Sequence, residues 1–185
     1  NIATGHYSLN VNTTGSYNTV VGSYSDVTSY NLTNATAIGN QAKVNASNKV
    51  RIGNSSVTVI EGQVNWSTGS DRRLKENIRY SDKPGLEFVN SLKTATFTYK
   101  NDPDKRHHNG LIAQDVRESL YQLGLDFSGI IENDNEEKIL NLSYAEFVIP
   151  LINSVKELTQ KNQEQQKQID DLKVLVSNLI ANQNK

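Results

Sequence analysis

The chain contains 185 residues, with 19 Lys and Arg, 20 Asp and Glu, and neither Cys nor Met. The near-neutral charge argues against a nucleic-acid-binding protein, which would carry a basic excess. The absence of Cys excludes a disulfide scaffold and any zinc site with cysteine ligands. No apolar run approaches the roughly 20 residues that span a bilayer, so we expect no membrane partner. Because the chain begins with Asn1 rather than Met, we expect it to be a piece of a longer protein.

The composition changes sharply near Gly69. Residues 1–69 contain only five charged side chains, and Asn, Ser and Thr supply 29 of the 69 positions. Residues 70–185 contain the other 34 charges. One homogeneous domain would not change chemistry this abruptly, so we predict a boundary between Gly69 and Ser70. The predicted organisation is a β-repeat shaft at 1–69, an α+β domain at 70–142 and a helix at 143–185.

A glycine repeat organises the first segment. Gly5, Gly22, Gly39 and Gly53 are spaced 17, 17 and 14 residues apart, and most follow small or β-branched residues. Short strands joined by turns at a fixed period indicate a β-roll or β-solenoid, and the alternating stretch 55–60 has the pattern of another strand. Each strand offers so few apolar residues that an isolated copy would bury too little surface to offset its chain entropy. We therefore expect several copies to share one core.

The alternative for this segment is a disordered linker rich in Asn, Ser and Thr. Periodic β-branched residues count against it, because low-complexity linkers lack them. The glycine-punctuated pattern resembles the head repeats of trimeric autotransporter adhesins and the shafts of phage tail fibres.

Residues 70–142 predict a mixed α+β region. A short helix is expected over 85–92, with Leu86, Val89 and Leu92 on one face, followed by a strand over 94–99. We expect a polar loop over 102–109, then a strand end or turn at 110–114 that enters a helix over 115–120. A hairpin is predicted from strands at 130–132 and 138–140.

The C-terminal segment carries a heptad repeat. Eight of ten a and d positions are apolar over five heptads, which indicates a coiled coil. Ser143 to Glu146 has the form of a capping box that starts the helix, and Pro150 is placed to kink it. The polar layers at Asn162 and Gln165 either fix register and strand number or mark a frayed stretch. Copies are expected to associate symmetrically, with two strands slightly favoured over three by this pattern alone.

The string from Gly69 to Ile78 has two interpretations. In the first, Ser70 or Asp71 is the N-cap of a charged helix. In the second, Ser70 and Lys75 form a catalytic dyad, in which Ser70 attacks the carbonyl of Gly69 and a lysine with a burial-lowered pKa takes its proton. Five α-helical residues rotate by about 500°, so the two side chains would not share a helix face. Either Ser70 lies on an extended lead-in, or the lysine comes from a neighbouring chain.

The string 70–78, followed by the phrase from His108 to Val116, resembles the intramolecular chaperone auto-processing domain of peptidase family S74. The resemblance covers about 70–185. Such domains close the C-terminus of phage tail spikes, tail fibres and neck appendages. It implies a domain that trimerises, folds an upstream β-structured shaft and then cuts itself off.

The resemblance also implies roles for individual residues. Ser70 matches the nucleophile and Lys75 the general base of a single-turnover serine endopeptidase that cuts between Gly69 and Ser70. Asp71 matches the acidic neighbour, and His108 a histidine needed for folding or processing. Gly110 and Gln114 are expected to be structural. Without the resemblance, His107 and His108 would be read as solvated residues of a polar loop, and two ligands do not make a metal site.

The sequence therefore predicts a mixed-class homotrimer whose partners are its own copies and, as folding client, the upstream part of the same fibre. No cofactor, metal, nucleic acid or membrane is expected. The shaft is expected in a virion tail or appendage, and the released domain in the host cytoplasm during assembly. The alternative is an uncut trimeric adhesin stalk with a permanent coiled-coil anchor. A glycan-cleaving site finds no support, because Asp26 and Glu61 are the only carboxylates in 1–69 and show no paired arrangement.

Overall fold

The computed structural model describes residues 1–100, 102, 104–133 and 138–183. These residues divide into two compact units: the first lies within 1–77, 95–110 and 131–141, and the second within 78–94, 111–130 and 142–185. The predicted mixed class is confirmed, including the long C-terminal helix. The linear division after Gly69 and after residue 142 stays a prediction.

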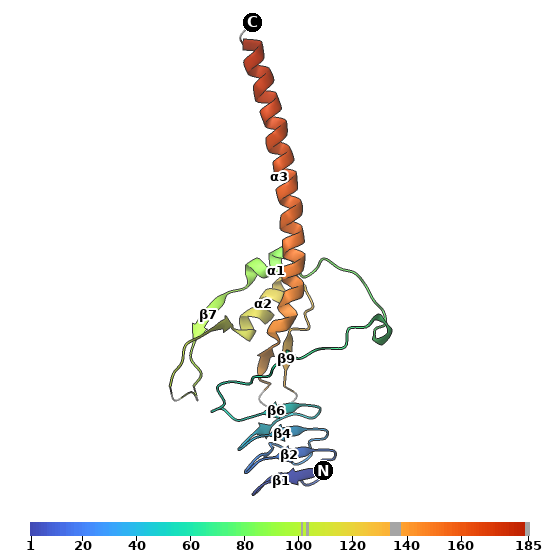
Figure 1. The fold of residues 1–185 in the computed structure, drawn as a ribbon, viewed down its shortest axis with the longest axis vertical. Helices are drawn as coiled ribbons and strands as arrows, with labels where there is room; N and C mark the ends of the chain where they lie inside the picture. Colours follow the sequence, from blue (N-terminus) through green and yellow to red (C-terminus); the bar gives the residue numbers. More distant parts are fainter. Residues whose placement is uncertain (101, 103, 134–137, 184–185) are drawn as a thin grey trace. The chain divides into compact units, whose positions relative to one another are not determined.

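Successive short strands of the first unit stack in parallel (Figure 1). One sheet has the order β1 (Ile2–Thr4), β2 (Thr19–Val21), β4 (Thr36–Ile38) and β6 (Val50–Ile52), and a second pairs β3 (Asp26–Val27) with β5 (Lys43–Val44). Ile2 pairs with Thr19, Thr19 with Thr36, and Thr36 with Val50. These registers reproduce the 17, 17 and 14 residue spacing of the repeat glycines.

The repeat glycines allow successive turns to approach closely. Gly5 and Gly22 have φ angles of +130° and +135°, which side-chain-bearing residues rarely adopt. A Cβ atom on Gly5 would lie 2.5 Å from the carbonyl oxygen of Gly22, and one on Gly22 would lie 2.5 Å from that of Gly39. At Gly5 and Gly22, glycine is therefore a steric requirement of the stack.

The core of the first unit is narrow. Its buried members are Val20, Val27, Leu32, Ala35, Ala37, Ala42 and Val44. Asp26 is buried beside them, where its carboxylate accepts hydrogen bonds from the backbone N–H groups of Val11 and Val27 and lies 3.7 Å from the Lys43 ammonium. This carboxylate thus has a structural role in the stack.

The second unit contains α1 (Leu86–Ser91), α2 (Ala113–Leu123), the 3₁₀ turn η2 (Tyr144–Phe147) and α3 (Val148–Gln183). Its core consists of Phe88, Val116, Leu120 and Phe147. The predicted apolar face of the first helix was incomplete, because Phe88 is fully buried whereas Leu86 is only half-buried. The larger aromatic ring reaches Phe127 and Phe147, with ring centroids 5.4 and 6.4 Å away.

Two strand pairs complete the described elements. β7 (Thr94–Phe97) pairs with β8 (His108–Leu111), and β9 (Ile130–Glu132) pairs with β10 (Leu140–Leu142). The loop predicted over 102–109 is wrong at its end, because His108 and Asn109 belong to β8. Pro103 of that loop, and residues 134 and 135 of the predicted hairpin turn, lie outside the described residues.

The C-terminal helix begins differently from the prediction. The Ser143 side chain makes no capping hydrogen bond, and the Glu146 carboxylate accepts instead from the hydroxyl of Ser128 at 2.9 Å, so the capping box is wrong. The turn η2 precedes α3, and Pro150 lies in the first turn of α3, where no intrahelical partner is needed for its nitrogen.

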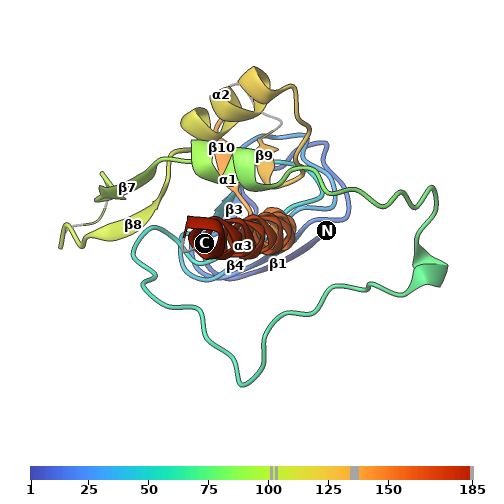
Figure 2. The ribbon, with the colours of Figure 1, turned by 90° about the horizontal axis from the view of Figure 1, so that it is seen from above.

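Figure 2 shows the backbone of α3 end-on. Apolar side chains are exposed along this helix. They include Val148, Leu151, Val155, Leu158, Ile169, Leu172, Val176 and Leu179. Among the helices that the structure describes, none is long and apolar enough to cross a membrane.

Candidate active site

The segment around Ser70 contains one short turn rather than the charged helix of the first interpretation. The 3₁₀ turn η1 covers only Arg72–Leu74. The residues on either side, Asp71 and Lys75, are extended, with ψ angles of 137° and 142°. A single tight turn between two extended residues reverses the chain locally, and this brings Lys75 back towards Ser70.

Lys75 and Ser70 are hydrogen-bonded. The Lys75 Nζ atom lies 2.8 Å from the Ser70 Oγ atom, within one chain. Ser70 therefore lies on an extended lead-in, which was one of the two arrangements left open by the sequence. Both side chains are exposed in this single chain.

Asp71 supplies the N-cap of η1. Its Oδ1 atom accepts a hydrogen bond from the backbone N–H of Arg73 at 2.8 Å. The same carboxylate accepts from the Arg73 guanidinium, through Nε at 3.0 Å and Nη2 at 2.7 Å. These bonds to Arg73 lower the pKa of Asp71, the side-chain bond most. Asp71 thus fixes the turn that separates Ser70 from Lys75.

Gly69 adjoins the same turn. A Cβ atom at Gly69 would lie 3.2 Å from the Leu74 Cδ1 atom, which is tighter than an ordinary van der Waals contact. Leu74 is exposed and its side chain can move aside, so this contact alone does not require a glycine at position 69.

His108 lies apart from this hydrogen-bonded group. In β8 it is half-buried, and its ring stacks on Phe97 and meets Tyr99 edge-on, with centroids 5.9 and 5.1 Å away. No hydrogen bond described in the structure joins His108 to Ser70, Asp71 or Lys75. The aromatic packing excludes the interpretation of His108 as a freely solvated side chain, whereas His107 is exposed.

The remaining candidates have no polar contact with the dyad. Gly110 lies within β8, and Gln114 is exposed near the start of α2. Within the described part of the chain, no group of three or more His, Asp and Glu side chains is arranged to hold a metal ion.

Sequence reasoning missed a contact between Lys49 and Asn133. The Lys49 Nζ atom donates to the Asn45 Oδ1 atom at 3.0 Å and to the Asn133 Oδ1 atom at 2.8 Å. Burial and the neighbouring charge of Arg51 lower the pKa of Lys49. No local pattern could have found this pair, because 84 positions separate the two residues.

Residues 70–125 match the family model Peptidase_S74, described as chaperone of endosialidase. The match begins at Ser70 and includes the turn η1, the His108 strand and helix α2. The resemblance seen in the sequence is therefore confirmed for this part of the chain, which is similar to the S74 family of endosialidase chaperones. None of the curated proteins compared with the chain matches it.

Proposed function

We propose that this chain is the C-terminal chaperone of a fibrous phage protein, which trimerises, aligns its β-repeat shaft and then releases itself by cutting the Gly69–Ser70 bond. The carrying observation is the 2.8 Å hydrogen bond between Lys75 Nζ and Ser70 Oγ at the first residue of the matched domain. The family model itself bears the name of a peptidase, which fits a serine nucleophile at this position.

The chemistry requires no cofactor. The Ser70 Oγ atom attacks the Gly69 carbonyl carbon while the neutral Lys75 amine takes the hydroxyl proton. The tetrahedral intermediate collapses, the bond from that carbon to the Ser70 nitrogen breaks, and Lys75 returns the proton to the leaving amine. Water then hydrolyses the resulting ester between Gly69 and Ser70 Oγ, leaving a Gly69 carboxylate and a free Ser70 hydroxyl.

The exposure of the dyad links this chemistry to assembly. A lysine serves as a general base only when burial favours its neutral form. Lys75 is exposed in the single chain, so the burial has to come from a neighbouring copy. On this proposal the bond is cut after the copies have associated.

Association itself is supported by the exposed apolar side chains of α3 and by the narrow core of the β stack. Aligning separate chains in register is entropically costly before any shared β contact forms. A domain that joins the copies first raises their local concentration and sets their register. In the same proposal the shaft belongs to a virion tail or appendage, and the released domain stays in the host cytoplasm where assembly occurs.

The test is the variant Ser70→Ala, with Ser67→Ala as the matched control at an exposed serine just upstream. Freshly made wild type and Ser67→Ala are expected to give fragments of 69 and 116 residues on denaturing electrophoresis and mass spectrometry. Ser70→Ala is expected to stay uncut and to remain a trimer by light scattering. If the Ser70→Ala chain still yields a fragment that begins at residue 70, the catalytic role of Ser70 is contradicted. A single uncut wild-type band would favour the alternative of a permanent adhesin-type stalk.

A further inference from the structure

The segment that leads from the β stack to Ser70 exposes large apolar side chains. Val57, Val59, Ile60, Val64 and Trp66 are all exposed, and Trp66, the single tryptophan of the chain, is 89% exposed. The strand predicted over 55–60 is wrong for the single chain, because these residues form a turn followed by irregular backbone. An extended stretch with this composition lacks the partner that would bury it.

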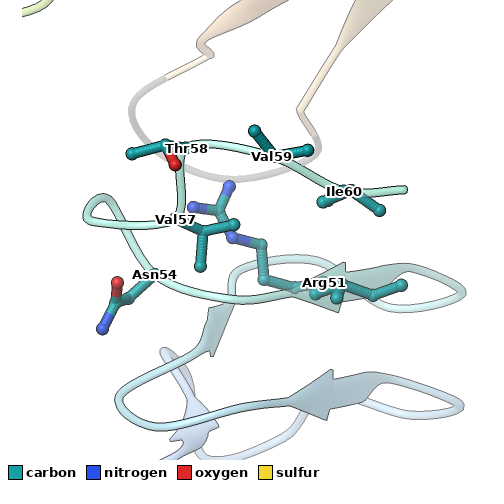
Figure 3. A pocket seen from close by; sticks show the side chains of 7 residues that line it. Arg51, Asn54, Val57, Thr58, Val59 and Ile60 are labelled. Carbon is teal, nitrogen blue, oxygen red and sulfur yellow. The ribbon is translucent and has the colours of Figure 1, made fainter.

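A cavity lies where this segment follows β6, the last strand of the β stack (Figure 3). Its volume is about 320 Å³, and its lining comes from the β6 residues Arg51 and Ile52, from Asn54, and from residues 57–60. Val57 packs so closely over Gly53 that a side chain at Gly53 would collide with it. Gly53 adopts φ +73°, and its lack of a side chain lets Val57 lie directly over it at the edge of the cavity.

The chemistry of the lining suits an aromatic ring. The lining is mixed: Arg51, Asn54 and Thr58 contribute polar groups, and Ile52, Val57, Val59 and Ile60 contribute apolar side chains. The Arg51 guanidinium lies beside Val57 (Figure 3). Arg51 uses its Nε atom to donate to the Gly53 carbonyl, which holds the planar group in place. A guanidinium is attracted to the face of an aromatic ring, most strongly to that of tryptophan, and tryptophan and arginine are among the residues that most often dominate the binding energy of an interface.

We propose that this cavity receives Trp66 of a neighbouring copy of the chain, with its indole ring against Arg51. The proposal rests on the homotrimer proposed above and names one contact of its interface. Trp66 of the same chain lies outside the cavity, on a segment that runs outside the stacked strands in Figure 2. In a symmetric homotrimer identical segments of neighbouring copies lie at the same level along the symmetry axis, and Trp66 and β6 belong to the same unit, so one copy's Trp66 can reach the next copy's β6.

This contact explains why the segment is unsupported in a single chain. Burying one tryptophan removes about 150–250 Å² of surface from water. The same contact would hold residues 57–66 in place just before Gly69, so that the chain leading to the scissile bond is ordered by a neighbour.

Because the chain has one tryptophan and no cysteine, two clean measurements test the proposal. Both use the uncut Ser70→Ala background, and light scattering first establishes whether trimers form. Trp66 emission is expected to shift to shorter wavelength on assembly, and in Arg51→Ala chains that still form trimers the emission intensity is expected to change. An emission maximum that stays at the fully exposed value in a proven trimer would overturn the inference.

Disulfide trapping identifies the chain that supplies the tryptophan. Two differently tagged chains, one with Trp66→Cys and one with Val59→Cys, are expected to form a reducible band that contains both tags. A matched pair with Tyr30→Cys, an exposed residue of an earlier turn, is expected to give at least tenfold less. If trimers form without the mixed band, the inference is contradicted but the proposed function is not. The same holds if Trp66 becomes buried against its own chain in the trimer. Failure to form trimers contradicts the proposed function itself.

Discussion

Lys49, in the last turn of the β stack, donates a 2.8 Å hydrogen bond to Asn133, which lies 84 positions later in the chain. The Asn133 Oδ1 atom also accepts from the Asn141 side chain at 3.1 Å, and its backbone N–H donates to the Ile139 carbonyl at 2.9 Å. Asn133 is therefore a buried junction between the β stack and the segment Ile131–Asn141 of the first unit. On the proposed function, this junction joins the two sides of the Gly69–Ser70 bond without a covalent link.

Replacing Asn133 by Ala is expected to lower the free energy of unfolding of the uncut chain by about 1–3 kcal/mol, because a charged donor and an amide donor lose the same acceptor. Chemical denaturation of the Ser70→Ala chain with and without the change measures the difference. Asn10→Ala, at an exposed asparagine, is the control and should have an effect within about 0.5 kcal/mol. Equal effects of the two changes would show that the junction contributes nothing.

On the proposed function, Asp71 is expected to act on cleavage by positioning, because it holds the turn η1 and makes no described hydrogen bond to Ser70 Oγ or Lys75 Nζ. Asp71→Ala removes the cap and is expected to slow self-cleavage several-fold. Asp71→Asn keeps a side-chain oxygen that can accept from the Arg73 N–H, and should restore much of the rate. Time courses of fragment formation compare the variants. If Asn is as slow as Ala, the negative charge rather than the cap is what matters.

The ion pair between Asp102 and Arg106 predicts a pH dependence. Their side chains meet at 2.9 Å, and this bond is the main reason that the pKa of Asp102 lies below its ordinary value. The folded carboxyl thus binds its proton less readily than the unfolded one. Its contribution to stability is complete above the unfolded pKa of about 3.9 and is lost as the pH falls through the lowered folded value.

Asp102→Asn is therefore expected to destabilise the fold at pH 7 and to have little effect at the lowest pH at which the chain remains folded. Urea midpoints at a series of pH values measure this difference. Asp82→Asn, at an exposed residue, should show no such trend. If the difference in urea midpoint between Asp102→Asn and wild type stays constant down to the lowest pH, the ion pair with Arg106 is not the source of the pH dependence.

The predictions from sequence succeeded where a local rule dictates the structure. The glycine period matched the register of the stacked strands, and at Gly5 and Gly22 a Cβ atom would collide with a carbonyl oxygen of the following turn. Residue types suggested a pair of Ser70 and Lys75 beside the alternative of a helix cap; their hydrogen bond is observed, and their catalytic role stays a prediction. The geometry of the pair could not be predicted, because one 3₁₀ turn and an α-helix are both compatible with the same charged string.

Other features depend on contacts that a sequence pattern does not contain. The choice of Phe88 over Leu86 as the core residue follows from the rings of Phe127 and Phe147, which arrive from distant segments. The stretch 55–60 has the alternation of a strand, but a strand forms only where its backbone pairs with a neighbour. Residues 55–60 form no described strand, although β6 is the terminal strand of its sheet. The junction of Lys49 with Asn133 likewise has no sequence signature.

The core of the second unit supplies a direct test of the chaperone role. Phe88→Ala removes a fully buried ring and is expected to cost about 3–5 kcal/mol, enough to unfold a domain of ordinary stability. On the proposed function, such a chain should neither trimerise nor cleave, although the change lies outside the first unit. Tyr80→Ala, at an exposed aromatic residue, is the control. Normal trimers and cleavage from a Phe88→Ala chain whose second unit is shown to be unfolded would contradict the chaperone proposal.

Asn162 occupies an a position of the heptad repeat, where its amide would lie in the seam of a coiled coil. A polar a residue restricts register and strand number at a cost in stability, so Asn162→Ile is expected to raise the melting temperature of the oligomer by about 5 °C and to broaden its distribution of sizes. Light scattering and thermal unfolding of the Ser70→Ala background follow both effects, with Lys167→Ala, at an outer heptad position, as the control. If the stretch around Asn162 is frayed instead, Ile at this position finds no partner side chain, and neither the melting temperature nor the oligomer size should change.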